Sequence, residues 1–184
     1  MRSANVTKMV FVSGFEQVGV QFFEKQAATQ GWKPHYAVTT TAGTGYNDMQ
    51  LSNEALSRIQ GVGWRPAKDV TALPGGGAAG ARCKALFKGY PGALDRANVS
   101  GSYELCEGFF FLEAGLLRSS GRSDATTLAA AWNSLGSSYR SPENLQGATL
   151  FAPGHKDGPH LFSTIGWVAG CACFRYQGAP RQVA

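Results

Sequence analysis

Three side chains near the C-terminus carry groups suited to acid–base chemistry, and a cysteine follows them. His155, Asp157 and His160 share one short segment rich in glycine and proline, and Cys171 comes soon afterwards. A cysteine becomes an active nucleophile when a base lies within hydrogen-bond reach, so a small α/β enzyme that uses His155, Asp157 and Cys171 is one alternative. A hairpin connection is the simpler account of this segment, and we expect no enzymatic activity.

The same residues do not have the spacing of a metal site. His155 and His160 lack helical spacing, and Asp157 is the one obvious further ligand near them. Paired cysteines in structural zinc sites usually have about two to four residues between them, whereas one residue separates Cys171 from Cys173. The sequence therefore predicts no metal.

A glycine-rich stretch matches the residue pattern of a dinucleotide-binding loop, but its flanking residues do not. Residues 75–80 fit the Gly-x-Gly-x-x-Gly pattern of dinucleotide-binding loops. That pattern holds a pyrophosphate only when it directly follows a strand and opens a helix. Pro74 and the polar residues before it remove that context, so we expect a flexible connection over residues 69–81 and no cofactor.

Composition and charge exclude two classes of partner. The chain has 184 residues, 43% of them hydrophobic and 16% charged, as in a globular protein of one domain or one and a part. Its net charge of +5 is scattered along the sequence. Nucleic-acid binding needs positive charge focused on one face, so we expect none. No segment approaches the roughly 20 apolar residues of a membrane-spanning helix, and we expect no span.

The first part of the chain has the pattern strand, helix, strand. An apolar strand is expected over residues 8–12, a helix over 16–30 and a β-branched and aromatic strand over 35–39. Such a unit normally joins adjacent parallel strands, whose carboxyl ends carry ligand-binding groups. A short helix within 48–57 and a third strand over 59–64 follow.

The second part begins with a helix that is apolar on more than one face. Residues 103–117 carry an apolar stripe, and further apolar residues occupy the opposite side. This helix needs burial on most faces, so a face left uncovered would form an exposed apolar patch that favours association. A second helix begins after Ser123 as N-cap and ends at Gly136. Strands are expected over 146–151, 161–168 and 173–176, with a turn over 153–159.

The succession of these elements resembles the type I periplasmic binding proteins, the solute receptors of ABC importers for branched-chain amino acids and related ligands. Residues 9–41 are similar to a strand with a Gly-aromatic turn, a helix and a second strand in the second lobe of that family. Residues 51–64 resemble its next short helix and central strand, and the helix from Ser102 resembles the one that returns toward the first lobe. The closing residues 171–176 look like actinobacterial members.

The resemblance implies a partial α/β fold of the periplasmic-binding-protein type I class. It comprises a Rossmann-like lobe with a parallel sheet, followed by C-terminal helices and strands. The expected parts are a βαβ portion of the second lobe over 1–68, a linker and short helix over 69–101, and return helices with C-terminal strands over 102–184.

By the same resemblance the chain holds only the later half of such a receptor. We expect a fragment, from a fragmentary gene or a mis-assigned start codon, and a truncated remnant without function is an alternative. The family is exported, so an extracytoplasmic location is implied although no signal peptide is apparent before residue 8. An ABC transporter permease is the implied partner if a complete first lobe exists.

The implied function is binding of a small-molecule solute in an interlobe cleft. The cleft residues would be Ser13 and Phe15 after the first strand, and Thr40 and Thr41 after the second. Amino-acid receptors of the family typically place a carboxylate after the second strand, where this chain has residues 39–43 without one. Unless Glu16 substitutes, a neutral or differently charged solute is expected in place of a simple α-amino acid.

The four cysteines form an even set, which permits disulfides in an oxidising compartment but also occurs in reduced cytosolic chains. One hypothesis links Cys83 to Cys106, which would tie the glycine-rich connection to the long helix. Cys171 and Cys173 would then remain as a local pair.

Overall fold

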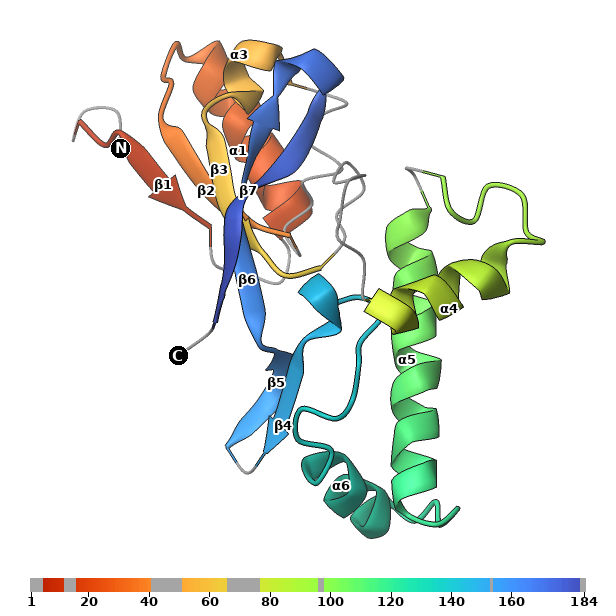
Figure 1. Cartoon of the computed structure of the whole chain (residues 1–184). Coiled ribbons are helices and arrows are strands. Elements are labelled where there is room, and N and C mark those ends of the chain that lie inside the picture. The colour runs from red at the N-terminus through yellow and green to blue at the C-terminus, as the bar shows by residue number, and fades with distance from the viewer. Residues whose placement is uncertain are drawn as a thin grey trace. The chain divides into compact units, whose positions relative to one another are not determined.

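The chain forms two compact units, each described here by itself (Figure 1). The first unit comprises Met1–Ala72 with Ser163–Ala179, and the second comprises Leu73–Phe162 with Pro180–Ala184. The sequence predicts that residues 163–179 belong with the helices in its third part, residues 102–184. In the structure, residues 163–179 belong to the same compact unit as the N-terminal segment. The computed structural model describes residues 5–11, 16–40, 51–65, 77–95, 98–152 and 154–182.

A five-stranded mixed sheet organises the first unit, in the order β1-β2-β3-β6-β7. The strands β1 (Lys8–Val10), β2 (His35–Thr39) and β3 (Ile59–Gly63) are parallel. β6 (Leu161–Val168) runs antiparallel to β3, and β7 (Cys173–Gln182) forms the edge. The expected α/β class is confirmed, and the sheet is mixed, with the parallel strands β1, β2 and β3 on one side of it.

The helix that joins β1 to β2 has a sequence-encoded end. α1 (Glu16–Thr29) stops before Gly31, whose φ of 64° suits a residue without a side chain. The short α3 (Asn53–Leu56) begins at Ser52, whose hydroxyl accepts a hydrogen bond from the Ala55 amide. The core of this unit lies between these elements and the sheet. Its most deeply buried side chains are Leu56, Ile59, Ile165 and Phe174.

Helices dominate the second unit, together with a two-stranded sheet. α4 (Gly77–Phe87) packs on the long α5 (Val99–Arg118), and α6 (Ala125–Asn133) packs on α5 as well. The sheet pairs β4 (Thr149–Ala152) with β5 (His155–Pro159) in antiparallel fashion. A short 3-10 turn, η2 (Leu145–Gly147), precedes β4, and a second one, η3 (Ala169–Cys171), lies between β6 and β7 in the first unit.

Aromatic packing against a glycine fixes α6 on α5. The Trp132 ring stacks on Phe111 with centroids 5.1 Å apart, and its indole N–H donates to the Phe111 carbonyl oxygen. A Cβ at Gly115 would lie 2.9 Å from two atoms of the Trp132 ring, so the close approach requires glycine there. The buried cluster beside it contains Cys83, Tyr103, Cys106, Phe110, Leu135 and Tyr139.

Three sequence expectations were wrong in detail. The connection over 69–81 already contains α4 from Gly77 onward, because small residues there pack closely in a helix. The expected turn over 153–159 contains β5, which pairs with β4 in spite of its glycine and proline. The N-cap of α6 is Asp124, whose carboxylate accepts from the Thr127 amide at 2.9 Å, and not Ser123.

Candidate functional site

The carboxyl ends of β2 and β3 are joined through one threonine. The Thr40 amide donates to the Val62 carbonyl oxygen at 3.2 Å, which continues the parallel ladder beyond β2. The Thr40 hydroxyl oxygen accepts a hydrogen bond from the Trp64 amide at 3.3 Å. Ligands of open α/β sheets bind outside this end of the parallel strands, so Thr40 and Trp64 mark the candidate binding edge of the first unit.

A tyrosine from β7 reaches the same edge. The Tyr176 hydroxyl donates to the Arg65 carbonyl oxygen at 2.8 Å and also hydrogen-bonds the side chain of Thr40. Burial raises the pKa of the Tyr176 phenol, so it is neutral throughout the physiological range. Tyr176 thus fixes the chain just after β3 with a neutral hydrogen-bonding group.

Gly63 makes this close arrangement possible. A Cβ added at Gly63 would lie 2.7 Å from the Tyr176 hydroxyl oxygen and 3.1 Å from the Thr40 hydroxyl oxygen. Any larger residue would therefore separate Thr40 from Tyr176. We name Thr40, Gly63, Trp64, Arg65 and Tyr176 the strand-end cluster.

Most of the predicted cleft residues fall outside the part of the chain that the structure describes. Ser13, Phe15 and Thr41 fall outside the described residues, and Glu16 begins α1 with its side chain outside them. Thr40 belongs to the cluster and is 7% exposed, with its hydroxyl engaged inside the unit. Its role toward a ligand stays a prediction.

Sequence reasoning did not identify Tyr176, Trp64 or Arg65 as site residues. Tyr176 is 111 residues from Arg65, and no local spacing connects them. Of these three residues, Trp64 could have been predicted from the sequence, because it directly follows a parallel strand, where ligands of open α/β sheets bind.

Two of the three residues of the alternative enzyme hypothesis have structural roles, and the side chain of the third, Asp157, lies outside the described residues. His155 opens β5 and pairs with Ala152 of β4. Cys171 is bonded to Cys173, so in this form it offers no thiolate nucleophile. Within the described ranges, no group of three or more histidine, cysteine or acidic residues could hold a metal ion. No described helix combines the length and apolar character that a bilayer crossing requires.

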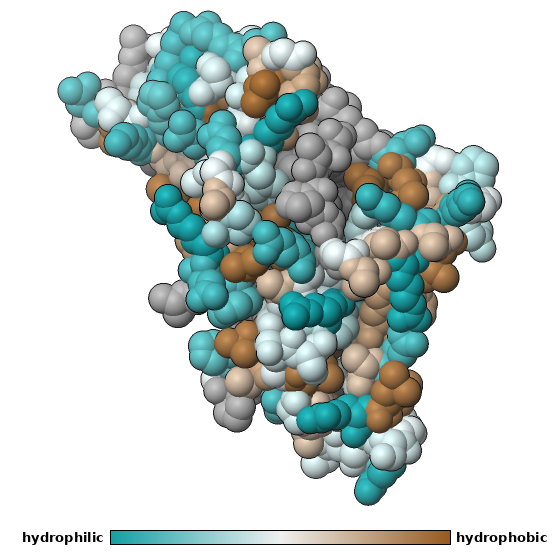
Figure 2. Space-filling view, in the orientation of Figure 1, coloured by the Kyte–Doolittle hydropathy of each residue, from teal (hydrophilic) through white to brown (hydrophobic). Residues whose placement is uncertain are grey.

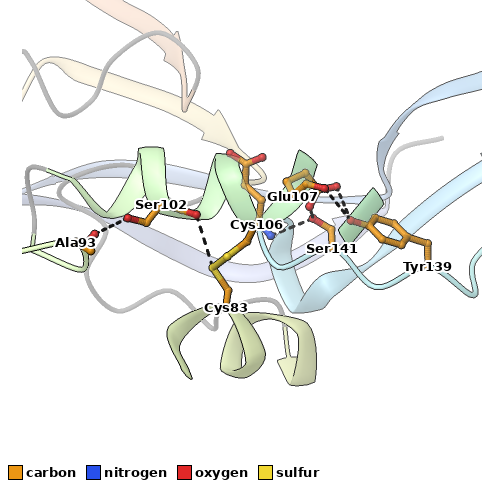
Figure 3. Close-up of a disulfide and its surroundings, with 8 residues drawn as sticks. Cys83, Ala93, Ser102, Cys106, Glu107, Tyr139 and Ser141 are labelled. Atoms are coloured by element: carbon orange, nitrogen blue, oxygen red, sulfur yellow. Dashed lines mark hydrogen bonds between the residues drawn. A yellow bond between two sulfur atoms is a disulfide. The ribbon is translucent and has the colours of Figure 1, made fainter. Parts of the chain in front are cut away.

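A disulfide and a polar network bind α5 to its surroundings in the second unit (Figure 3). Cys83 of α4 is bonded to Cys106 of α5, with Cα atoms 5.8 Å apart. On the next residue of α5, the Glu107 carboxylate accepts hydrogen bonds from the Tyr139 hydroxyl at 3.1 Å and from the Ser141 hydroxyl. Ser141 in turn accepts from the Asn144 amide at 3.0 Å. These bonds hold the segment after α6 against α5.

One side of α5 presents apolar side chains to solvent. Leu105 is 56% exposed, Phe109 69% and Leu112 42%, and Leu86 of α4 is 55% exposed. We name Leu86, Leu105, Phe109 and Leu112 the α5 apolar face. A groove of about 520 Å³ runs between α4 and α5 beside it, and Figure 2 shows apolar surface over these two helices. An apolar surface of this kind marks a site of association.

Comparisons with known proteins find relatives by structure and not by sequence. No protein-family model matches the chain, and no curated protein sequence matches it significantly. The chain is similar over 100% of its length to a branched-chain amino acid ABC transporter protein from Thermus thermophilus with bound valine, with a TM-score of 0.69 and 15% identity. That match covers 48% of the Thermus chain.

Two further structures agree in fold. A fatty acid ABC transporter substrate-binding protein from Thermomonospora curvata matches 99% of this chain and 45% of its own, with a TM-score of 0.63 and 16% identity. A type 1 periplasmic binding protein from Bordetella pertussis matches 97% of this chain and 48% of its own, with a TM-score of 0.57 and 16% identity. The chain spans less than half the length of these structures and has the fold of that part of a type I periplasmic binding protein.

Proposed function

We propose that this chain is part of the solute-binding component of an ABC-type importer and contributes one wall of a cleft for a small molecule. The observation that carries the proposal is the match of the whole chain to a valine-bound transporter protein at a TM-score of 0.69. The strand-end cluster lies at the edge of the sheet where ligands of open α/β folds bind, which supports the same conclusion.

The mechanism follows from differential affinity. A ligand that contacts both lobes of a two-lobed receptor binds the closed arrangement more tightly and shifts the population toward it. No bond is made or broken in this step. The hydrogen bonds among Thr40, Trp64 and Tyr176 would keep the first unit's wall in one geometry, so little ordering is required on binding.

The chemistry of the wall favours a neutral or differently charged solute over a simple α-amino acid. Residues 39–43 contain no carboxylate that could pair with an ammonium group. Tyr176 is neutral, and the Thr40 hydroxyl is already hydrogen-bonded to the Trp64 amide and to Tyr176, so neither side chain supplies a negative charge. A buried ammonium without an opposing charge would be costly, so a solute without a free ammonium group fits this wall better.

A complete receptor requires a further lobe in contact with this chain. The α5 apolar face supports this part of the proposal, because helices of α/β domains normally bury such a face against a sheet. With that lobe, the partner would be a membrane permease and the location extracytoplasmic. Two disulfides fit such a location, since disulfides persist in oxidising compartments.

Calorimetric titration of the protein isolated from its source tests this proposal. Three probes would be compared: valine, a medium-chain fatty acid and a neutral amide. We expect one saturable site for a solute without a free α-ammonium, and Tyr176→Phe should weaken binding about tenfold. Tyr90→Phe is the matched control, because Tyr90 is 68% exposed and lies in the second unit. Valine binding with unchanged affinity in Tyr176→Phe would contradict the proposed ligand chemistry.

A further inference from the structure

The turn between β6 and β7 holds a disulfide that closes over a single residue. Cys171 ends η3, Cys173 begins β7, and their Cα atoms lie 5.2 Å apart. Ala172 between them has φ 45° and ψ 50°, the left-handed conformation. Glycine adopts this conformation freely, but a residue with a Cβ adopts it at a cost in free energy. The short ring thus coincides with an unfavourable backbone conformation.

The second disulfide of the chain provides an internal reference. Cys83 and Cys106 are separated by 23 positions, whereas Cys171 and Cys173 are separated by 2. A disulfide restricts the unfolded chain more when it closes a longer loop. Loop length alone therefore makes the equilibrium constant for forming the disulfide from the dithiol roughly 20-fold smaller for the short bridge than for the long one.

The two bridges also differ in exposure. Cys83 is 0% exposed and Cys106 3% exposed, so α4 and α5 shield that bond. Cys171 is partly exposed, and its neighbours Ala169, Gly170 and Ala172 are exposed on the surface turn. Cys171 is therefore the cysteine of this pair that is more open to a dissolved thiolate. Cys173 is 4% exposed, which makes its sulfur the inner one of the pair.

The reduced form has a hydrogen-bond acceptor ready. The Cys171 sulfur lies 3.4 Å from the Val168 carbonyl oxygen, close enough for a thiol to donate a weak hydrogen bond. Reduction would also free Ala172 to leave the left-handed region. Both effects favour the dithiol.

We propose that Cys171 and Cys173 form a thiol–disulfide exchange site that accepts two electrons from a dithiol. A thiolate of the dithiol attacks the Cys171 sulfur, the Cys171–Cys173 bond breaks, and Cys173 leaves as a thiolate that takes up a proton. The second thiolate of the donor then attacks the donor sulfur of the mixed disulfide, and Cys171 leaves as a thiolate that takes up a proton. The protein gains two thiols, and the donor becomes a cyclic disulfide.

Differential alkylation tests the proposal on the full chain. The oxidised protein is equilibrated with graded ratios of reduced to oxidised dithiothreitol, and free thiols are alkylated and located by mass spectrometry. We expect half reduction of Cys171 and Cys173 at a ratio of reduced to oxidised dithiothreitol about 20-fold lower than the ratio that half reduces Cys83 and Cys106. Return to oxidised dithiothreitol should restore the bond. Equal or reversed midpoints for the two pairs would overturn the proposal.

A glycine substitution isolates the contribution of the backbone. Ala172→Gly removes the cost of the left-handed conformation, so the midpoint should shift about fivefold toward a higher reductant ratio. Ala169→Gly, in the same exposed turn but in the 3-10 helix, is the matched control and should leave the midpoint within about twofold. An unchanged midpoint in Ala172→Gly would overturn the inference that the closed ring holds strain.

Discussion

The Tyr176 hydroxyl donates a hydrogen bond of 2.8 Å to the Arg65 carbonyl oxygen, from the last strand of the chain to the residue pair that follows β3. The bond joins positions 111 residues apart in sequence. Because the acceptor is a backbone group on a partly buried segment, its loss would leave an unsatisfied carbonyl. Tyr176 therefore links the C-terminal strands to the candidate binding edge.

Tyr176→Phe should destabilise the protein by about 1–2 kcal/mol. The ring stays and fills the same space, so the effect reports the hydrogen bonds alone. Urea unfolding followed by circular dichroism measures the change. Tyr90→Phe, at an exposed tyrosine in the turn that follows α4, should leave stability unchanged. Equal midpoints for Tyr176→Phe and the unmodified protein would show that the hydroxyl contributes nothing.

Gly63→Ala should be destabilising by roughly 2 kcal/mol, because the new methyl group would press first on the methyl group of Thr40 and then on the Tyr176 hydroxyl. Gly108→Ala is the control, a glycine-to-alanine substitution that should stabilise the protein. No atom lies within 4 Å of a Cβ at Gly108 on α5, so alanine should stabilise that helix by about 0.5–1 kcal/mol. Thermal unfolding of both variants tests the pair, and stabilisation by Gly63→Ala would contradict the described packing.

Glu24 should make the free energy of unfolding fall as pH rises, which is the opposite of the usual effect of a carboxyl group. Its side chain is buried on α1, and neither carboxyl oxygen has a hydrogen-bond partner among the described residues. Burial raises the pKa of Glu24 from 4.5 to about 8, against the opposing effect of the Arg58 guanidinium. Between those two values the folded state binds more protons than the unfolded state. The Glu24 contribution therefore lowers stability as pH rises through this window.

Glu24→Gln should remove this dependence and raise the free energy of unfolding near pH 8 relative to the unmodified protein. The expected slope that disappears is at most about 1.4 kcal/mol per pH unit. Urea unfolding at intervals from pH 5 to about pH 9 measures it. Glu113→Gln is the control, since the Arg82 hydrogen bond lowers the pKa of Glu113 and places its titration below this window. A steep fall that persists in Glu24→Gln would contradict the assignment.

The α5 apolar face should drive self-association of the isolated chain. Phe109→Glu places a charge in the middle of this face and should shift sedimentation toward the monomer. Phe22→Glu is matched in chemistry and exposure, at 66% against 69% for Phe109, and lies on α1 of the first unit. The prediction fails if both substitutions change the sedimentation profile equally.

Local patterns identified the first half of the fold because each element there is bounded by its own signals. The strand over 35–39 coincides with β2, and the helix over 16–30 differs from α1 by one residue at its end. Gly31 stops that helix through its positive φ, which is a purely local effect. The parallel pairing of β1 with β2 then follows from the right-handed connection.

Patterns were less informative where tertiary contacts decide. The start of α4 lies in a glycine run, yet Cys83 and Cys106 tie that helix to α5, and no local propensity reveals this. β5 contains Gly158 with a φ of 76° and still pairs with β4. Tyr176 joined the candidate site through a contact of long sequence separation, which no motif in one sequence encodes.

Native mass spectrometry of the protein isolated from its source tests the central claim most directly. The account predicts an assembly well above the 19.5 kDa of this chain, in which a second lobe covers the α5 apolar face and a small-molecule adduct is retained. A smaller fraction of the protein should retain the adduct when Tyr176 is replaced by phenylalanine. A 19.5 kDa monomer that carries no adduct would contradict the account.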